Sequence, residues 1–316
     1  FMAVGFWLIG SRIAVMSKER GYLTPADFIR DRYGSPLLAK IFSSLMIVFT
    51  LPYIAIQSIA AGRSLQSLAG LPYWTGALLV SGFVVLYVML GGMRSVAWTD
   101  VVQALMMLLF TLAAFIIIAV KSGGFIWTSG ELFASRPELF ARPGLDGSMI
   151  PGVWLGYLIL WLFADPMFPQ LFQRFIAAKD LKSLKTTVVL YPLITTFLFF
   201  LTVSIGVLGR ASFPNLSATE SESVFPMLLN RFVGPALSTL LLTGGLAALM
   251  STLDSQLLTV SSQLTLDFRR VRRKEVRVER LAVVLIGALG FLIALKPPQT
   301  ILDFINKTSF TGLAVL

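Results

Sequence analysis

The chain has 316 residues, of which 56% are hydrophobic and only 13% are charged, and its mean hydropathy is +0.81. A water-soluble domain of this length does not carry so apolar a composition, which indicates a polytopic membrane protein. The sequence contains no Cys and no His. Disulfides, thiolate or imidazole metal sites and histidine acid–base chemistry are therefore excluded, and we do not expect an enzyme.

The net charge is +10. In so apolar a chain, an excess of Lys and Arg is typical of cytoplasmic loops, and we predict contact with the lipid bilayer and no nucleic-acid partner. The densest basic run lies between Arg269 and Arg280. Anionic lipid at a cytoplasmic membrane boundary explains such a run better than nucleic acid does. The predicted location is the plasma (cytoplasmic) membrane.

Long apolar runs predict an all-α bundle of eight spans in a single transmembrane domain over residues 1–316. Alternating the loops between the two sides gathers most basic residues on one side, which we assign to the cytoplasm. A ninth span begins near Thr300 and is cut short. Because Phe1 is not Met and both ends lie in apolar runs, we interpret the chain as a fragment of a longer protein. The eight predicted spans cover residues 1–16, 37–69, 73–91, 96–120, 151–173, 186–209, 233–265 and 280–296.

A short interfacial helix is predicted in the first cytoplasmic loop. Thr24 suits a helix N-cap, Pro25 suits the first helical position, and Asp27 falls in the first turn. The alternative is a solvated connector with no function of its own.

Three carboxylates fall within predicted spans, at Asp100, Asp165 and Asp254, and Asp303 lies in the truncated span. A charged side chain at the centre of a membrane helix costs about 2.5 to 3.5 kcal/mol on insertion scales. Each of these residues therefore needs a partner, a cavity or a proton, and each is a candidate functional residue.

The span around Asp254 carries a stripe of hydroxyls on one helical face. The alternative interpretation is packing, in which Ser and Thr donate to the carbonyl four residues earlier. Adjacent hydroxyls beside a carboxylate instead favour a site for a hard cation, since Na⁺ takes neutral oxygen ligands. The stripe consists of Ala248, Ser251, Thr252, Ser255, Thr259 and Ser262.

Asp100 stands at the predicted cytoplasmic start of a span, with Gln103 three residues later. This spacing resembles a capping arrangement, which the helix dipole favours. Taken alone, Asp100 is therefore better explained as a cap than as a ligand.

Two prolines, Pro166 and Pro169, predict that the span beginning near residue 151 breaks at mid-membrane. A broken helix at that depth must face protein or a watery cavity, and it is typical of transporter substrate sites. The alternative is a simple proline kink.

Four stretches resemble the sodium:solute symporter family. They are residues 23–28, 91–100, 169–180 and 248–258, in family order along nearly the whole chain. The resemblance implies a LeuT-like core of two inverted five-helix repeats. It also implies that this fragment begins in the second core helix, so that the first, which supplies backbone oxygens to the sodium site, is absent.

Carried over by position, the resemblance implies that Na⁺ binds the carbonyl of Ala248 and the hydroxyls of Ser251 and Thr252. A second sodium position, seen in some members, matches Asp100, Ser251 and Ser255. Asp254 departs from those members, some of which have Ser there. It could strengthen cation binding, carry a proton, or pair with a base such as Arg94.

For the substrate, Trp161 and Pro169 match pocket residues of the family's proline transporters. Asp165 replaces an aromatic residue, and Gln170 replaces a His that often follows the proline. These departures put proline in question and leave room for a polar or cationic solute. The resemblance implies Na⁺-coupled import of a small organic solute. The alternative is a membrane domain of the same fold that senses a solute for an attached cytoplasmic kinase.

Overall fold

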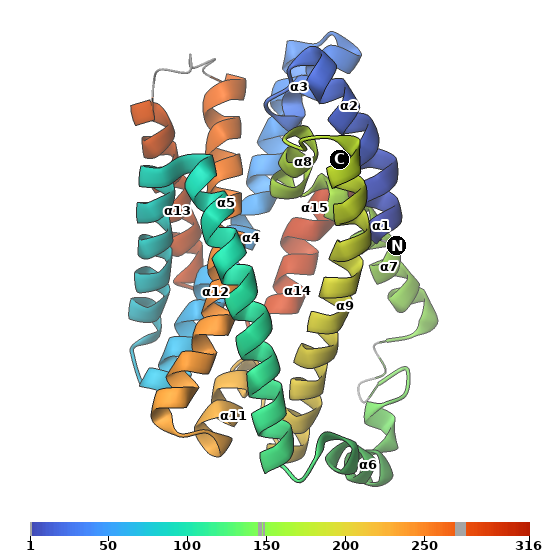
Figure 1. Ribbon diagram of the computed structural model, residues 1–316, viewed down its shortest axis with the longest axis vertical. Helices are drawn as coiled ribbons and strands as arrows, with labels where there is room; N and C mark the ends of the chain where they lie inside the picture. The colour runs from blue at the N-terminus through green and yellow to red at the C-terminus, as the bar shows by residue number, and fades with distance from the viewer. Residues whose placement is uncertain (1, 145–146, 148, 269–275) are drawn as a thin grey trace.

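The computed structural model describes residues 2–144, 147, 149–268 and 276–316, and all regular structure among them is helical. The long helices run roughly along the longest axis of the molecule (Figure 1). Most of the predicted basic run, residues 269–275, lies outside the described residues.

The first predicted span is a continuous helical stretch with a wider π-helical turn in its middle. It comprises α1 (Met2–Gly5), the π-helix η1 (Phe6–Gly10) and α2 (Ser11–Arg20). The predicted interfacial helix is present as α3 (Pro25–Tyr33), and α4 (Pro36–Ala69) follows as a long apolar helix.

α3 begins as the sequence predicts and is also fixed to the rest of the bundle. The Asp27 carboxylate accepts from the backbone N–H of Leu23 at 2.9 Å and of Thr24 at 3.1 Å. The hydroxyls of Thr24 and Ser43 donate to the two oxygens of Asp267, at 2.6 and 2.7 Å. Asp267 is only 2% exposed, so one buried carboxylate joins α3, α4 and the end of a third helix.

The predicted spans 73–91 and 96–120 are joined in one kinked helix, α5 (Tyr73–Lys121). The kink lies at Gly92, whose φ of 60° and ψ of −158° are outside the helical region. Only glycine adopts this conformation readily. The chain therefore reverses direction at the end of the molecule that carries α3 (Figure 1).

The predicted broken span is a pair of helices, α7 (Pro151–Met167) and α8 (Pro169–Ile176), bent by 50°. The break lies at Phe168, which has the extended ψ of 125° that a following proline imposes. Pro166 is accommodated inside α7. Only the second of the two prolines therefore ends the helix.

Two further long helices, α9 (Leu181–Ser212) and α12 (Pro235–Gln263), cross the molecule, and α12 continues into the π-helix η3 (Leu264–Phe268). Short helices lie at the end opposite α3, where Figure 1 labels α6 and α11. These short helices are α6 (Phe125–Ser135), η2 (Pro137–Leu139), α10 (Ala218–Ser221) and α11 (Val224–Phe232). The chain ends in α13 (Val276–Ala294), α14 (Ile301–Ile305), the π-helix η4 (Asn306–Phe310) and α15 (Thr311–Ala314).

Among the described residues, four helices are long and apolar enough to cross a membrane: α4, α5, α9, and α12 with η3. The bent pair α7–α8 makes five. The kinked helix α5 contains two of the predicted spans, one on each side of Gly92. The chain can therefore cross the membrane more often than the number of these helices suggests. The count of eight and the single domain remain predictions.

The centre of the bundle is formed by α4, α5, α12 and α13. Buried Ile54, Val84, Leu257 and Ile286 pack together there. At the outer end of α4, a Cβ on Gly62 would lie 2.8 Å from the backbone oxygen of Tyr73, so only glycine allows this approach of α4 to α5. This rigid centre holds the polar residues described below.

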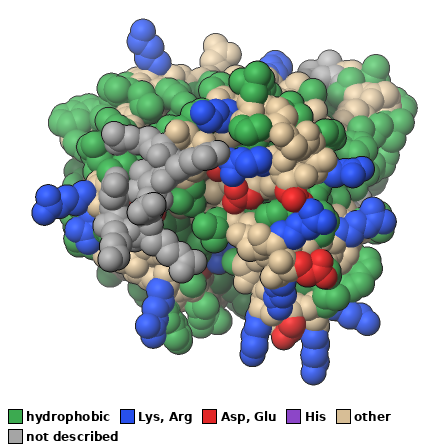
Figure 2. Space-filling model, turned by 90° about the horizontal axis from the view of Figure 1, so that it is seen from above, with side chains coloured by type: hydrophobic (Ala, Val, Ile, Leu, Met, Phe, Trp, Pro, Cys, Tyr) green, Lys and Arg blue, Asp and Glu red, His purple; other side chains and the backbone are tan. Residues whose placement is uncertain are grey.

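Basic side chains gather at the end of the molecule that carries α3 and α8. Figure 2 views this end and shows Lys and Arg projecting around it. Exposed members include Arg20, Arg32, Lys40, Lys179 and Lys182. This distribution agrees with the assignment of this end to the cytoplasm.

Candidate functional site

Three oxygens predicted to bind sodium converge on one turn of α12. The hydroxyls of Ser251 and Thr252 each donate to the carbonyl oxygen of Ala248, at 3.1 Å. All three residues are half-buried. Neutral hydroxyl and carbonyl oxygens gathered in this way are ligands suited to Na⁺ once the hydroxyls turn their lone pairs toward the ion.

Like Ser251 and Thr252, the hydroxyls further along α12 donate to carbonyls of their own helix, as the packing alternative describes. Ser262 donates to the carbonyl of Leu258 at 2.8 Å. The Thr259 hydroxyl lies 2.8 Å from the carbonyl oxygen of Ser255 and 2.6 Å from Oε1 of Gln173 on α8, and these two acceptors share its single hydrogen. This part of the stripe fixes α8 against α12.

Asp100 is not a helix cap, because α5 continues through it and its carboxylate faces other helices. Arg174 of α8 donates through Nη2 to Oδ2 of Asp100 at 2.5 Å and to Oγ of Ser255 at 3.0 Å. Ser255 donates in turn to the same Oδ2 at 3.4 Å. The structure therefore brings together the predicted ligands Asp100 and Ser255, with a guanidinium already bound to them.

Asp254 is fully buried next to this group and does not pair with Arg94, which is exposed. Instead, Tyr87 donates to Oδ2 of Asp254 at 2.6 Å, and Thr99 donates to it at 3.4 Å. Within the described part of the chain, no donor reaches the other oxygen, Oδ1.

The adjacent residues Thr99 and Asp100 on α5 thus meet the adjacent residues Asp254 and Ser255 on α12. Two carboxylates lie at this crossing, and Arg174 is the only basic side chain that forms an ion pair with either of them in the described ranges. The crossing therefore has one more negative charge than positive charge unless a proton or a further cation is bound.

The predicted solute residues lie at the break between α7 and α8. Trp161 and Asp165 are four residues apart and share one face of α7, while Pro169 is buried at the start of α8. Asp165 is 3% exposed. Trp161 packs edge-to-face on Phe310 of η4, with ring centroids 4.7 Å apart. No interaction within the described residues joins these side chains directly to Ser251 or Thr252.

Sequence reasoning did not assign roles to Arg174, Tyr87 or Gln173. Arg174 and Gln173 belong to a stretch that resembles the family, and Tyr87 lies in an apolar run, which gives only a weak signal. Their partners are between 74 and 167 positions away in the chain. A local pattern cannot predict pairs of this kind.

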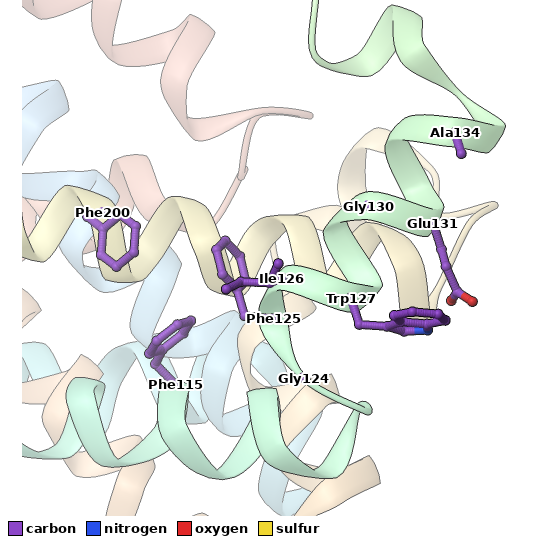
Figure 3. Close-up of a pocket in the computed structure, with 9 residues that line it drawn as sticks. All are labelled: Phe115, Gly124, Phe125, Ile126, Trp127, Gly130, Glu131, Ala134 and Phe200. Atoms are coloured by element: carbon purple, nitrogen blue, oxygen red, sulfur yellow. The ribbon is translucent and has the colours of Figure 1, made fainter.

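A large groove lies elsewhere, beside α6 at the end opposite α3 (Figure 1). It encloses about 930 Å³ and is lined mainly by apolar side chains. Figure 3 shows Phe115, Phe125 and Phe200 around it, with Glu131 as its one charged side chain. Since this surface is apolar and open, it is suited to lipid and not to a polar solute.

Comparison with known proteins identifies the family. The model of the sodium:solute symporter family matches residues 1–315. The chain belongs to this family. It is an integral membrane protein of the plasma membrane with a LeuT-like, all-α fold, as the sequence predicts.

Two relatives are symporters or transporters by name. The sodium/pantothenate symporter of Escherichia coli is 30% identical over 97% of this chain and 64% of its own length. The osmoregulated proline transporter OpuE of Bacillus subtilis is 33% identical over 90% of this chain and 59% of its own length. The chain therefore spans about three fifths of these relatives. They are transporters and not enzymes, and they lend no support to the sensor alternative.

A solved structure supports the fold. It is described as the substrate-bound outward-open state of a Na⁺-coupled sialic acid symporter with a novel Na⁺ site. Its TM-score is 0.67 at 22% identity, and the match covers 92% of this chain and 67% of that one.

Proposed function

We propose that this chain belongs to a secondary active transporter that imports a small organic solute together with Na⁺. The observation that carries the proposal is the convergence of the Ala248 carbonyl with the Ser251 and Thr252 hydroxyls on α12. Family membership and the names of the relatives support sodium as the coupling ion.

In this proposal, Na⁺ binds Ala248, Ser251 and Thr252, and a second cation position is formed by Asp100 with Ser251 and Ser255. The ion stabilises the state in which solute reaches Trp161, Asp165 and Pro169 at the broken helix. Rocking of one part of the bundle against the other then exposes both to the cytoplasm. Each Na⁺ that enters down a potential of 100 mV contributes about 2.3 kcal/mol before its concentration gradient is counted.

The test is the thermal stability of the purified full-length protein, titrated with NaCl against KCl at constant ionic strength. A ligand that binds only the folded state raises its stability in a saturable way. We expect a Na⁺-specific rise in the wild type that Ser251→Ala abolishes. Ser262→Ala is the matched control, because Ser262 lies on the same stripe and bonds only to its own helix. An unchanged Na⁺ response in Ser251→Ala would refute the assignment.

A further inference from the structure

The carboxylate of Asp165 is buried without a compensating charge. Its side chain lies in α7, one turn before Phe168, where the helix breaks. Within the described residues, no donor reaches its Oδ2, and no Lys or Arg forms an ion pair with it. An ionised carboxylate in such a place carries a large desolvation cost unless a cation joins it.

Aromatic side chains lie on both sides of Asp165 along the chain. Trp161 lies one turn earlier on the same face of α7, and Phe168 lies one turn later, where the helix breaks. Phe168 packs edge-to-face on Tyr53, with ring centroids 5.4 Å apart. Phe310 closes the group by contacting Trp161, Tyr53 and Phe168.

A carboxylate among aromatic rings recognises a particular chemistry. The faces of Trp, Tyr and Phe attract a cation through their quadrupoles, and the carboxylate supplies the full opposite charge. A neutral ligand would leave the ionised carboxylate unpaired, so that the carboxylate would have to take up a proton, and a purely anionic ligand would be repelled. The group therefore fits a positively charged nitrogen.

We propose that the transported solute carries a cationic nitrogen, as an organic ammonium ion or a zwitterion, which binds Asp165 beside Tyr53, Trp161 and Phe168. The inference rests on the proposed transport function and deepens it by naming the class of solute. A solute of this class compensates the buried charge, so its binding stabilises the broken helix as well as the complex.

Two more buried acceptors lie on the elements that adjoin Asp165. Oε1 of Gln170 on α8 and Oδ1 of Asn306 on η4 have no donor within the described part of the chain. The two residues are 8% and 5% exposed. A solute with N–H or O–H groups in addition to its cationic nitrogen would satisfy such acceptors.

The test uses a matched pair of probes on the purified full-length protein in 150 mM NaCl, a concentration at which exposed charges are largely screened. Choline and its neutral isostere 3,3-dimethylbutan-1-ol have the same shape and differ in charge. The panel also includes the zwitterions glycine betaine and L-proline, and pantothenate as an anion without a cationic nitrogen. Binding is measured as the shift in thermal stability with ligand concentration.

We expect at least one cationic or zwitterionic probe to stabilise the wild type, and choline to bind at least about tenfold more tightly than its isostere. Asp165→Asn should abolish this difference. Asp303→Asn is the control, because the carboxylate of Asp303 on α14 is exposed and paired with Lys307, unlike the buried Asp165, and its removal should not change the difference. Any of three results overturns the inference. The first two are that no cationic or zwitterionic probe stabilises the wild type, and that choline binds the wild type less than about tenfold more tightly than its isostere. The third is that Asp165→Asn still binds choline more tightly than the isostere by the same factor.

The same measurement in KCl separates this inference from the proposed function. Stabilisation by pantothenate that requires Na⁺ and survives Asp165→Asn would keep the transport function and refute the ammonium site. Stabilisation by a cationic probe that is lost in Asp165→Asn but is equal in NaCl and KCl would support the site and argue against coupling to sodium.

Discussion

Arg174 donates to Asp100 across the junction between α8 and α5, with 2.5 Å between Nη2 and Oδ2. The same nitrogen donates to Ser255 on α12. A positively charged group belonging to the protein therefore occupies the position at which the family resemblance places a second cation. The other oxygen of Asp100, Oδ1, is buried and receives no donor within the described residues. Because the guanidinium neutralises the charge of Asp100 and repels a second cation, it weakens the attraction of this carboxylate for Na⁺.

Removing this guanidinium should strengthen cation binding. We expect Arg174→Gln to lower the half-saturating Na⁺ concentration in the stability titration. The ion pair is partly exposed and is worth about 1 kcal/mol or less, which corresponds to a change of roughly fivefold at most. Lys179→Gln is the control, since Lys179 is a nearby exposed base whose side chain is not bound to Asp100. A higher half-saturating concentration would mean that Arg174 assists the ion.

Tyr87→Phe should destabilise the protein. The variant keeps the ring but removes the donor that lies 2.6 Å from the buried Asp254 carboxylate. Loss of a hydrogen bond to a buried charged group costs about 1 to 3 kcal/mol, so the melting temperature should fall. Tyr33→Phe, at a ring that is 64% exposed, should leave it unchanged. Equal melting temperatures for wild type and Tyr87→Phe would show that Asp254 does not need this donor.

The buried Asp267 predicts coupling between two substitutions. Thr24→Val and Ser43→Ala each remove one of its donors, and each should lower stability by about 1 to 3 kcal/mol. Because both donors satisfy one carboxylate, the double variant should deviate from additivity by more than about 0.5 kcal/mol. Ser44→Ala is the control, as its hydroxyl bonds only to the carbonyl of Lys40. Strict additivity would argue against a shared role.

Gly92→Ala should be poorly tolerated. The φ of 60° and ψ of −158° at this position are available to glycine and strained for alanine, at about 1 to 3 kcal/mol. We expect a lower melting temperature and less folded protein in the membrane. Gly82→Ala, in a helical part of α5 with open space around the added Cβ, should be neutral or stabilising. Similar behaviour of the two variants would count against the kink.

Asp180 predicts a pH dependence at the cytoplasmic start of α9. Its carboxylate accepts from the backbone N–H of Ser183 at 2.7 Å, and this bond holds the pKa of Asp180 below its usual value. A lowered pKa in the folded state contributes stability above the unfolded pKa, and this contribution is lost as the pH falls through the folded pKa. The stability difference between wild type and Asp180→Ala should therefore narrow in acid. At neutral pH, the stability of Asp180→Asn should be close to that of the wild type, because Asn is also a good N-cap.

Local patterns predicted the elements of this protein more completely than their contacts. The start of α3 at Pro25 and the hydroxyl stripe on α12 follow from spacing and capping, which depend on residues within one or two turns. The break between α7 and α8 was also predicted, but its exact place was not. Phe168 departs from the helix because a proline follows it, whereas Pro166 is absorbed within α7.

The partners of the buried carboxylates could not be predicted in this way. Asp100 does not cap a helix and Asp254 does not pair with Arg94, as two of the alternatives had it, whereas cation binding at Asp100 stays a prediction. The structure pairs Asp100 with Arg174 and Asp254 with Tyr87. These pairings depend on how α5, α8 and α12 are rotated about their axes and shifted along one another. Short patterns in a single sequence do not determine that arrangement.

The break at Phe168 makes α8 a short helix whose far end moves when the bend at the break changes. Arg174 lies six residues beyond the break, which is about 9 Å along a helix at 1.5 Å per residue. Turning α8 by about 10° at the break would displace that point by about 1.5 Å, enough to separate a hydrogen-bonded pair. A change of bend at Phe168 would therefore act on both polar contacts that α8 makes with its neighbours, the Arg174–Asp100 pair with α5 and the Gln173–Thr259 bond with α12.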